Sequence, residues 1–303
     1  MAMAWIGWVL ATAAANAAAA PPAAEGARTL VHQGLERHYV VRAPASASAA
    51  LPLVLVLHGG GGNAAISEQM TGFTDKAMRE GFVVVYPEGT ARRGSGRLLT
   101  WNAGHCCGHA MERRVDDVGF IRALVDRLVA ERLVDPRRVY VTGMSNGAMM
   151  AHRLGIELPD RIAAIAPVVG ALFGDEPKPA KPVAALMING RLDASVPPAG
   201  GAPGGRFPWA WDGKPALPAL AQGSFWAAAN GCGDTPEATE RGPLAQWRYR
   251  CTPGREVELL IVADNGHAWP GGRAGSRRGD TPSTAVDATD LIWRFFQRQV
   301  KQR

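Results

Sequence analysis

The sequence has no long run of basic residues. Its 33 Lys and Arg are scattered among 27 Asp and Glu, giving a net charge of +6, and only the short tail at 298–303 groups them. A protein that binds nucleic acid usually concentrates positive charge in a patch or stripe. We therefore expect no nucleic-acid partner, and the surplus charge favours solubility or contact with an anionic polymer instead.

Long hydrophobic runs are also missing. The apolar stretch Trp5–Ala14 is too short to cross about 30 Å of hydrocarbon, and no Lys or Arg precedes it. Small residues follow at 15–20, as they do at the cleavage site of an export signal. We expect residues 1–20 to be a signal peptide cleaved after Ala17 or Ala20; a disordered Ala-rich leader is the alternative. The mature chain would then be secreted or periplasmic, with no membrane span.

The absence of internal repeats and of later linkers limits the number of domains. No internal repeat is visible, and no linker follows Gly26. Residues 21–27 are therefore expected to be a linker and residues 28–303 a single domain. The glycine run at 59–62 has no Gly-Lys-Ser or Gly-Lys-Thr after it, which excludes a P-loop.

The sequence does contain an alternation of apolar runs and helical patterns. Strands at 28–33 and 37–42 are expected to pair as a hairpin around Gly34. Buried strands are expected at 51–57, 82–86, 139–142, 162–169, 183–188 and 256–262. Helices are expected at 69–80, from Asp116 or Asp117 onward, and at 148–158, 224–230 and 286–299, with a long loop at 88–115. This order predicts an α/β fold, with a mainly parallel central sheet covered by helices on both faces.

A Gly-x-Ser-x-Gly turn, at 143–147, stands between the strand 139–142 and a helix. This pattern is typical of a nucleophile elbow, which exposes a serine hydroxyl at the carboxyl edge of a sheet. A Cβ at Gly143 or Gly147 is expected to collide with neighbouring backbone, and Ser145 to adopt strained backbone angles. The alternative is a plain turn with Ser145 as the helix N-cap.

A serine needs a base, an orienting acid and an oxyanion hole before it can act as a nucleophile. After an elbow, the acid and then the histidine follow along the chain. His267 fits as the base because it follows the last predicted strand, whereas the other six histidines precede Ser145 or lie on its helix. Asp193 fits as the acid because it follows the strand 183–188. The competing aspartates are Asp160, Asp175, Asp212, Asp234 and Asp264.

An oxyanion hole requires two N–H groups that point at the developing negative charge. We expect one from Asn146, directly after the nucleophile, and the other from Gly60 in the glycine run. Glycine lets the backbone approach the substrate closely. His58 precedes the run and either holds this loop by side-chain hydrogen bonds or is simply packed there.

Six motifs together resemble one known family. From Thr29 to Phe296 the chain is similar to secreted esterases of the polyhydroxybutyrate depolymerase-like family, which includes feruloyl and acetyl-xylan esterases of carbohydrate esterase family one. The motifs are His58-Gly-Gly60, Trp101-Asn-Ala-Gly-His-Cys-Cys-Gly108, Val115-Asp-Asp-Val-Gly-Phe120, Gly143-Met-Ser-Asn-Gly147, Asn230-Gly-Cys232 and Gly266-His-Ala-Trp-Pro-Gly-Gly272. The resemblance implies an α/β-hydrolase fold, a triad of Ser145, Asp193 and His267, and no metal or other cofactor. The segment 189–194 departs from the family's His-Gly-Thr-x-Asp-Pro; it keeps the aspartate, and its altered neighbours bear on substrate preference.

Tryptophans near these motifs are candidates for substrate binding. Trp101 and Asn102 are expected to line the acyl pocket, with core packing as the alternative for Trp101, and Trp269 is a third candidate. Trp209 and Trp211 lie in the loop 197–218, which either covers the site or covers the core. The triplet Arg278-Gly-Asp280 is interpreted as a surface turn.

Four cysteines allow three disulfide connectivities, and export would favour their oxidation. The preferred bridge is Cys232–Cys251. The neighbours Cys106 and Cys107 either bond to each other or remain thiols. A zinc site with His105 and His109 is the rival interpretation, and the resemblance implies no metal.

Together these features predict a secreted serine carboxylesterase that works through an acyl-enzyme. Its expected substrates are feruloyl or acetyl esters of plant polysaccharide, or similar short or aryl esters. Depolymerisation of polyhydroxybutyrate oligomers is the alternative, and a non-catalytic binding protein with a hydrolase fold is a further one. No separate carbohydrate- or polyester-binding module is visible, which weakens the case for a crystalline polymer as the substrate.

Overall fold

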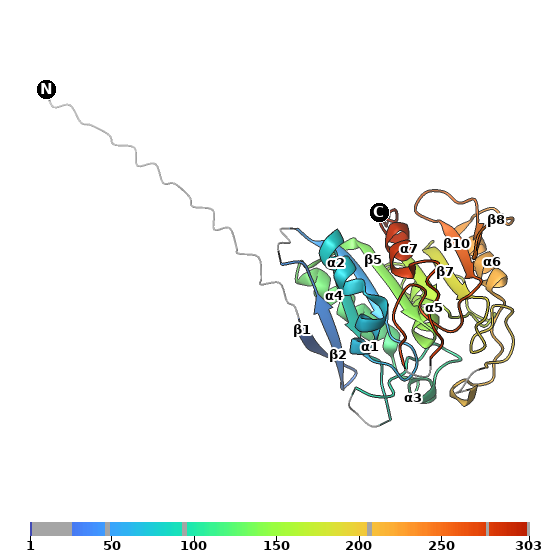
Figure 1. The fold of residues 1–303 in the computed structure, drawn as a ribbon. Coiled ribbons are helices and arrows are strands. Elements are labelled where there is room, and N and C mark those ends of the chain that lie inside the picture. Colours follow the sequence, from blue (N-terminus) through green and yellow to red (C-terminus); the bar gives the residue numbers. More distant parts are fainter. Residues whose placement is uncertain (2–25, 46–48, 93–95, 205–207, 277–278, 302–303) are drawn as a thin grey trace.

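The computed structural model describes residues 1, 26–45, 49–92, 96–204, 208–276 and 279–301. Apart from Met1, the predicted signal peptide lies outside the described residues, as do residues 21–25 of the predicted linker. The described chain forms a ten-stranded sheet in the order β1-β2-β4-β3-β5-β6-β7-β10-β9-β8 (Figure 1). Residues 26–27, expected in the linker, instead begin the first strand, β1 (Gly26–His32).

Six parallel strands form the middle of this sheet, as predicted. In spatial order they are β4 (Val83–Pro87), β3 (Leu51–Leu57), β5 (Val134–Met144), β6 (Ala164–Val168), β7 (Ala184–Gly190) and β10 (Val257–Val262). Antiparallel strands flank them: β1 and β2 (Leu35–Arg42) on one side, β9 (Leu244–Arg248) and β8 (Glu237–Arg241) on the other. The carboxyl ends of the parallel strands share one edge, so the loops that follow them converge there.

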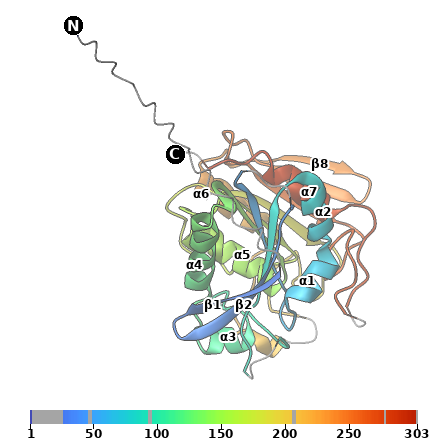
Figure 2. The ribbon, with the colours of Figure 1, turned by 90° about the vertical axis from the view of Figure 1, so that its left-hand side faces the viewer.

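Alternate residues of the central strands point to opposite faces and build two hydrophobic cores. Leu53, Leu55 and Leu57 belong to one core, and Val54 and Val56 belong to the other. The first core is completed by α4 (Asp117–Ala130), α5 (Asn146–Glu157) and α6 (Ala219–Asn230), and the second by α1 (Ala64–Thr71), α2 (Phe73–Glu80) and α7 (Ala288–Phe296). Figure 2 shows these two groups of helices on either side of the sheet. The arrangement is the predicted α/β-hydrolase fold.

Several predicted elements differ from the structure. The single helix predicted at 69–80 is wrong, because Gly72, at φ 67°, ends α1 and separates it from α2. Helix α1 begins earlier than predicted, after Asn63, whose side chain accepts the N–H of Ile66 at 2.9 Å. The predicted loop 88–115 contains the short helix α3 (Gly108–Glu112). Strand β5 starts at Val134, earlier than the predicted strand 139–142.

The hairpin β8–β9 was not predicted. All of β8 is exposed at the edge of the sheet, so its sequence shows no alternation between buried and exposed positions. The predicted start of α4 at Asp116 or Asp117 is confirmed: Asp117 is its first residue, and Asp116 caps it by accepting the N–H of Gly119 at 2.9 Å. None of the helices in the described ranges is long and apolar enough to cross a membrane.

Candidate active site

The turn between β5 and α5 has the geometry of a nucleophile elbow. Ser145 lies between them at φ 56° and ψ −121°, a conformation that a non-glycine residue rarely adopts. A Cβ on Gly143 would lie 2.7 Å from the backbone of Gly147, and one on Gly147 would lie 2.5 Å from the carbonyl oxygen of His58. The steric reason predicted for the two glycines is therefore confirmed, and the turn holds Ser145 at the carboxyl edge of the sheet.

His267 and Asp193 meet because their strands are neighbours. Strands β7 and β10 pair in parallel, and the loops after them carry Asp193 and His267 respectively. His267 Nδ1 lies 2.8 Å from Asp193 Oδ2. An ionised carboxylate only accepts hydrogen bonds, so Nδ1 carries the proton and Nε2 keeps a free lone pair.

The carboxylate of Asp193 is buried, and its other oxygen is also satisfied. Its side chain is 1% exposed, and Oδ1 accepts the N–H groups of Ser195 and Val196, each at 2.8 Å. Charge-assisted hydrogen bonds of this kind fix a carboxylate firmly. The orientation of the His267 ring is therefore set by a rigid partner.

Ser145 and His267 line the same cavity of about 800 Å³. Within the described residues the Ser145 hydroxyl forms no hydrogen bond, and so it is not bonded to His267 Nε2. Catalytic hydrogen bonds are often loose without substrate and tighten in the complex. The cavity thus brings together a serine, a histidine with a free Nε2 and a buried carboxylate behind it.

The glycine run forms the wall beside Ser145. A Cβ on Gly59 would lie 3.6 Å from Ser145 Cβ, and a Cβ on Gly60 would lie 3.7 Å from Asn146 Cβ. The N–H groups of Gly61 and Gly62 donate to Leu99 and Gly59, whereas the N–H of Gly60 enters no loop hydrogen bond of the described chain. Asn146 is the first residue of α5, so the helix itself leaves its N–H unpaired.

His58 holds the glycine run by side-chain hydrogen bonds, as one of the two sequence interpretations required. Its Nδ1–H donates to the carbonyl oxygen of Gly59 at 2.8 Å, and its Nε2 accepts the N–H of Gly89 at 3.0 Å. The ring is fully buried, and this burial lowers the pKa of His58 to about 4. The imidazole is therefore neutral at neutral pH, as both hydrogen bonds require.

Two of the predicted substrate-binding residues, Trp101 and Asn102, do not line this cavity, and we correct that expectation. Trp101 is completely buried, and its indole N–H donates to the carbonyl oxygen of His58 at 3.0 Å. Asn102 is 8% exposed, and its amide donates to the carbonyl oxygen of Val115 at 3.0 Å. Trp101 therefore supports the elbow from the core, which was the alternative interpretation of this residue.

Other tryptophans do contribute to the cavity. Trp211 lines it and packs edge-on against Phe173, with ring centroids 5.7 Å apart. Trp269 also lines it but is only 1% exposed, and its indole N–H donates to the Thr289 hydroxyl at 3.1 Å. The side chain of Trp209 lies outside the described residues. The apolar wall is completed by Ile66, Met70, Leu98 and Val196.

Asp280 was not predicted as a site residue. It lines the cavity, and its carboxylate accepts the backbone N–H of His267 at 2.6 Å. The sequence carried only a tripeptide at this place, interpreted as a surface turn, and Arg278 lies outside the described residues. A contact between a loop aspartate and a main-chain N–H leaves no pattern by which it could have been found.

The cysteines form disulfides. Cys232 and Cys251 are bonded as predicted and close the hairpin β8–β9 at its base. Cys106 and Cys107 are bonded to each other, which is the first of the two alternatives considered for this pair. His105 contacts Asp212 at 2.6 Å and Asp175 at 3.0 Å.

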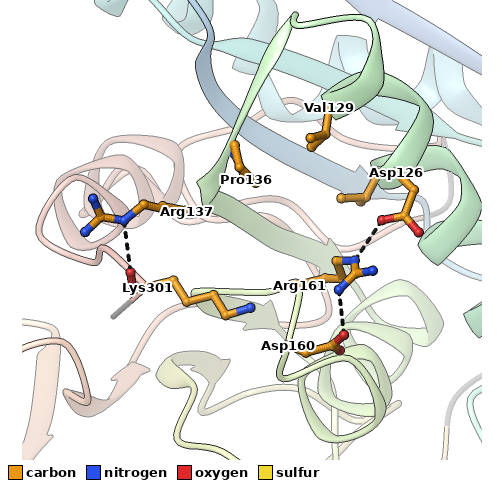
Figure 3. A pocket seen from close by; sticks show the side chains of 8 residues that line it. Asp126, Val129, Pro136, Arg137, Asp160, Arg161 and Lys301 are labelled. Atoms are coloured by element: carbon orange, nitrogen blue, oxygen red, sulfur yellow. Dashed lines mark hydrogen bonds and ion pairs between the residues drawn. The ribbon is translucent and has the colours of Figure 1, made fainter. Parts of the chain in front are cut away.

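A second cavity, at the opposite edge of the sheet, has different lining residues from the cavity at Ser145 (Figure 3). It has about 340 Å³ and lies where β5 begins, beside Pro136. Arg161 crosses it and is held by Asp126 at 2.7 Å and Asp160 at 2.6 Å (Figure 3). None of its eight lining residues pairs a nucleophile with a base, so the cavity at Ser145 is the candidate active site.

The chain is similar to known esterases. The family model named esterase PHB depolymerase matches residues 37–199. The protein NocK of Nocardia uniformis subsp. tsuyamanensis, whose name assigns it to the esterases, is 33% identical over 86% of this chain and 81% of its own length. Feruloyl esterase B of Piromyces equi is 31% identical over 79% of this chain, which spans 44% of that protein.

A solved structure gives the same fold. The acetyl xylan esterase from Aspergillus awamori matches 90% of this chain and 99% of its own with a TM-score of 0.62 at 12% identity. At that identity the likeness concerns the fold alone, while the sequence relatives carry the assignment. The chain is a hydrolase of ester bonds and belongs to the esterase PHB depolymerase family.

Proposed function

We propose that the protein is a serine carboxylesterase in which Ser145 is the nucleophile, His267 the base and Asp193 the acid. The observation that carries this proposal is the 2.8 Å contact between His267 Nδ1 and Asp193 Oδ2, on a cavity that Ser145 also lines. That contact leaves Nε2 free to take the serine proton. A non-catalytic binding protein would have no need of a strained serine beside a histidine oriented in this way.

The reaction follows from the positions of these groups. Ser145 Oγ attacks the ester carbonyl while His267 Nε2 takes its proton, and Asp193 stabilises the imidazolium that forms. The N–H groups of Gly60 and Asn146 donate hydrogen bonds to the negatively charged oxygen of the tetrahedral intermediate and stabilise it. His267 then returns the proton to the departing alcohol, and water hydrolyses the acyl-enzyme by the same steps.

For the substrate, we propose feruloyl or acetyl esters of plant polysaccharide or similar short or aryl esters. Trp211 lines the cavity together with apolar side chains, and stacking of an aromatic group on such a ring contributes about 1 kcal/mol beyond area burial. Relatives named feruloyl esterase and acetylxylan esterase support this choice. Hydroxybutyrate oligomers are the second candidate, because other relatives are named poly(3-hydroxyalkanoate) and poly(3-hydroxybutyrate) depolymerases.

We also propose that residues 1–20 direct export and that residues 28–303 act as one catalytic domain in the periplasm or outside the cell. The bridge between Cys232 and Cys251 supports this, because structural disulfides persist in oxidising compartments. The intact mass of protein recovered from the periplasm should show loss of the first 17 or 20 residues. Retention of the leader there would contradict the proposal.

A fluorophosphonate probe tests the function. The wild-type protein should be labelled, and Ser145→Ala should not be. A side-by-side assay of methyl ferulate, acetylated xylan and hydroxybutyrate trimer then separates the substrates. Release of hydroxybutyrate with no activity on the other two would replace the preferred substrate and leave the mechanism unchanged.

A further inference from the structure

We propose that Asp280 is a positioning residue that holds the main chain of His267, a second carboxylate beside the one that orients its ring. This inference rests on the proposed role of His267. Asp280 Oδ2 accepts the His267 N–H at 2.6 Å, while Asp193 accepts the ring N–H at 2.8 Å. The two carboxylates come from different segments and restrain different parts of the same residue.

The close approach of Asp280 requires a glycine beside His267. A Cβ on Gly266 would collide with the Asp280 carboxylate. Any larger residue at 266 would therefore push the carboxylate away from the N–H that it accepts. Glycine at this position thus permits the hydrogen bond, as glycine commonly does where chain segments meet closely.

Further bonds tie the segment 279–283 to the histidine loop. Ser283 donates its N–H to Asn265 Oδ1 at 2.9 Å and its hydroxyl to Asp264 Oδ1 at 2.7 Å. The N–H of Gly271 donates to the carbonyl oxygen of Ser283 at 2.7 Å. These bonds fix residues 264, 265 and 271, which lie on either side of His267. Only Asp280 reaches His267 itself from this segment of the described chain.

The consequence for catalysis is a matter of placement. A displacement of about 1 Å in a catalytic group can cost about a hundred-fold in rate. Without Asp280 the backbone of His267 loses a charge-assisted restraint, and Nε2 moves relative to Ser145. Asp280 is exposed and lies at the cavity, so its removal should reduce kcat and leave the fold intact.

The test compares Asp280→Ala with Asp280→Asn. The asparagine keeps an oxygen that accepts the N–H and removes the charge, whereas alanine removes both. We expect Asp280→Ala to lower kcat on an aryl ester about ten-fold to a hundred-fold with KM nearly unchanged, and to slow fluorophosphonate labelling equally. Asp280→Asn should keep at least about a third of the wild-type kcat. Asp234→Ala, at an exposed aspartate far along the chain in the β8 region, is the matched control and should behave as the wild type.

Each outcome decides the inference. Wild-type kcat in Asp280→Ala would overturn it, and so would an Asp280→Asn variant as slow as Asp280→Ala, because the charge and not the hydrogen bond would then matter. Thermal unfolding of every variant checks that the fold persists. Ser145→Ala is measured alongside: if it stays active, the proposed function fails, whereas its inactivity with an unaffected Asp280→Ala removes the role of Asp280 alone.

Discussion

The two sides of the candidate site are held in different ways. On the elbow side, residues 57–63 and 143–149, the backbone is fixed by contacts that leave no room for a Cβ at Gly143 or Gly147. On the loop side, residues 191–196 and 264–271, the backbone is fixed by side-chain hydrogen bonds from Asp193, Asn265 and Asp280. The turn that carries the nucleophile is thus placed by backbone sterics, with His58 bonding the glycine run beside it, whereas the base is placed by polar contacts. Substitutions on the two sides should therefore fail differently.

Removing the reacting groups should give the largest effect on either side. Ser145→Ala and His267→Ala should each lower kcat by a factor on the order of 10⁴ or more, because the triad acts as a unit. Neither side chain supports the core, so circular dichroism and the unfolding temperature should stay close to wild type. A well-folded variant with near-normal ester turnover would remove that residue from the mechanism.

The elbow side should be intolerant of a single methyl group. Gly147→Ala would place a Cβ 2.5 Å from the carbonyl oxygens of Leu57 and His58, which should cost about 3 kcal/mol or more of unfolding free energy. Gly60→Ala is the matched control, because its Cβ would meet only Asn146 at an ordinary 3.7 Å. Urea unfolding measures both variants, and equal stability would contradict the steric account of the elbow.

The elbow side should also lose stability in acid, through His58. Burial lowers the pKa of His58 from 6.5 to about 4, so between these values the unfolded chain binds more protons than the folded one. Stability should therefore fall by about 3 kcal/mol as the pH drops from 6.5 to 4. In His58→Gln, whose amide can make similar hydrogen bonds, the pH dependence of unfolding should be flatter. An unchanged slope would exclude His58 as its source.

The contact between His105 and the loop that carries Asp212 should make stability depend on pH with the opposite sign and a smaller amplitude. Partial burial lowers the pKa of His105, but the hydrogen bond with Asp212 and the charges of Asp212 and Asp175 outweigh it and raise the pKa above its usual value. This contribution to stability is complete below about pH 6.5 and is lost as the pH rises through the raised pKa. Lys214 also binds Asp175, at 3.0 Å.

His105→Gln isolates this effect. Its unfolding temperature should lie below that of the wild type near pH 6, and the difference should shrink by pH 9. Because Asp212 follows Trp211 directly, KM should rise in this variant more than kcat falls. A difference in unfolding temperature that grows toward alkaline pH would show that the sign is wrong.

The same contrast explains how far the sequence could be interpreted. The elbow is a local motif, so its strand, glycines and helix all lie within about twenty consecutive residues and could be predicted. The order of Ser145, Asp193 and His267 along the chain, and the strands they follow, sufficed to select them as the candidate triad. The parallel sheet followed from apolar runs that are buried on both faces.

What could not be predicted depends on contacts between distant segments. Asp280 and His267 meet through a main-chain N–H, which has no signature in the sequence. Trp101 is a residue type that often lines substrate pockets, yet its indole N–H donates to the carbonyl oxygen of His58 in the core. The helix predicted at 69–80 crosses the boundary between α1 and α2, because an isolated glycine such as Gly72 can also stand inside a helix.

The most direct test of the central claim is to trap the acyl-enzyme. An aryl ester is mixed with stoichiometric enzyme, the reaction is quenched in acid, and the protein is analysed by mass spectrometry before and after digestion. The account predicts a mass increase equal to one acyl group, located on the peptide that contains Ser145 and absent from Ser145→Ala. An acyl group on another residue, or undiminished turnover in Ser145→Ala, would contradict it.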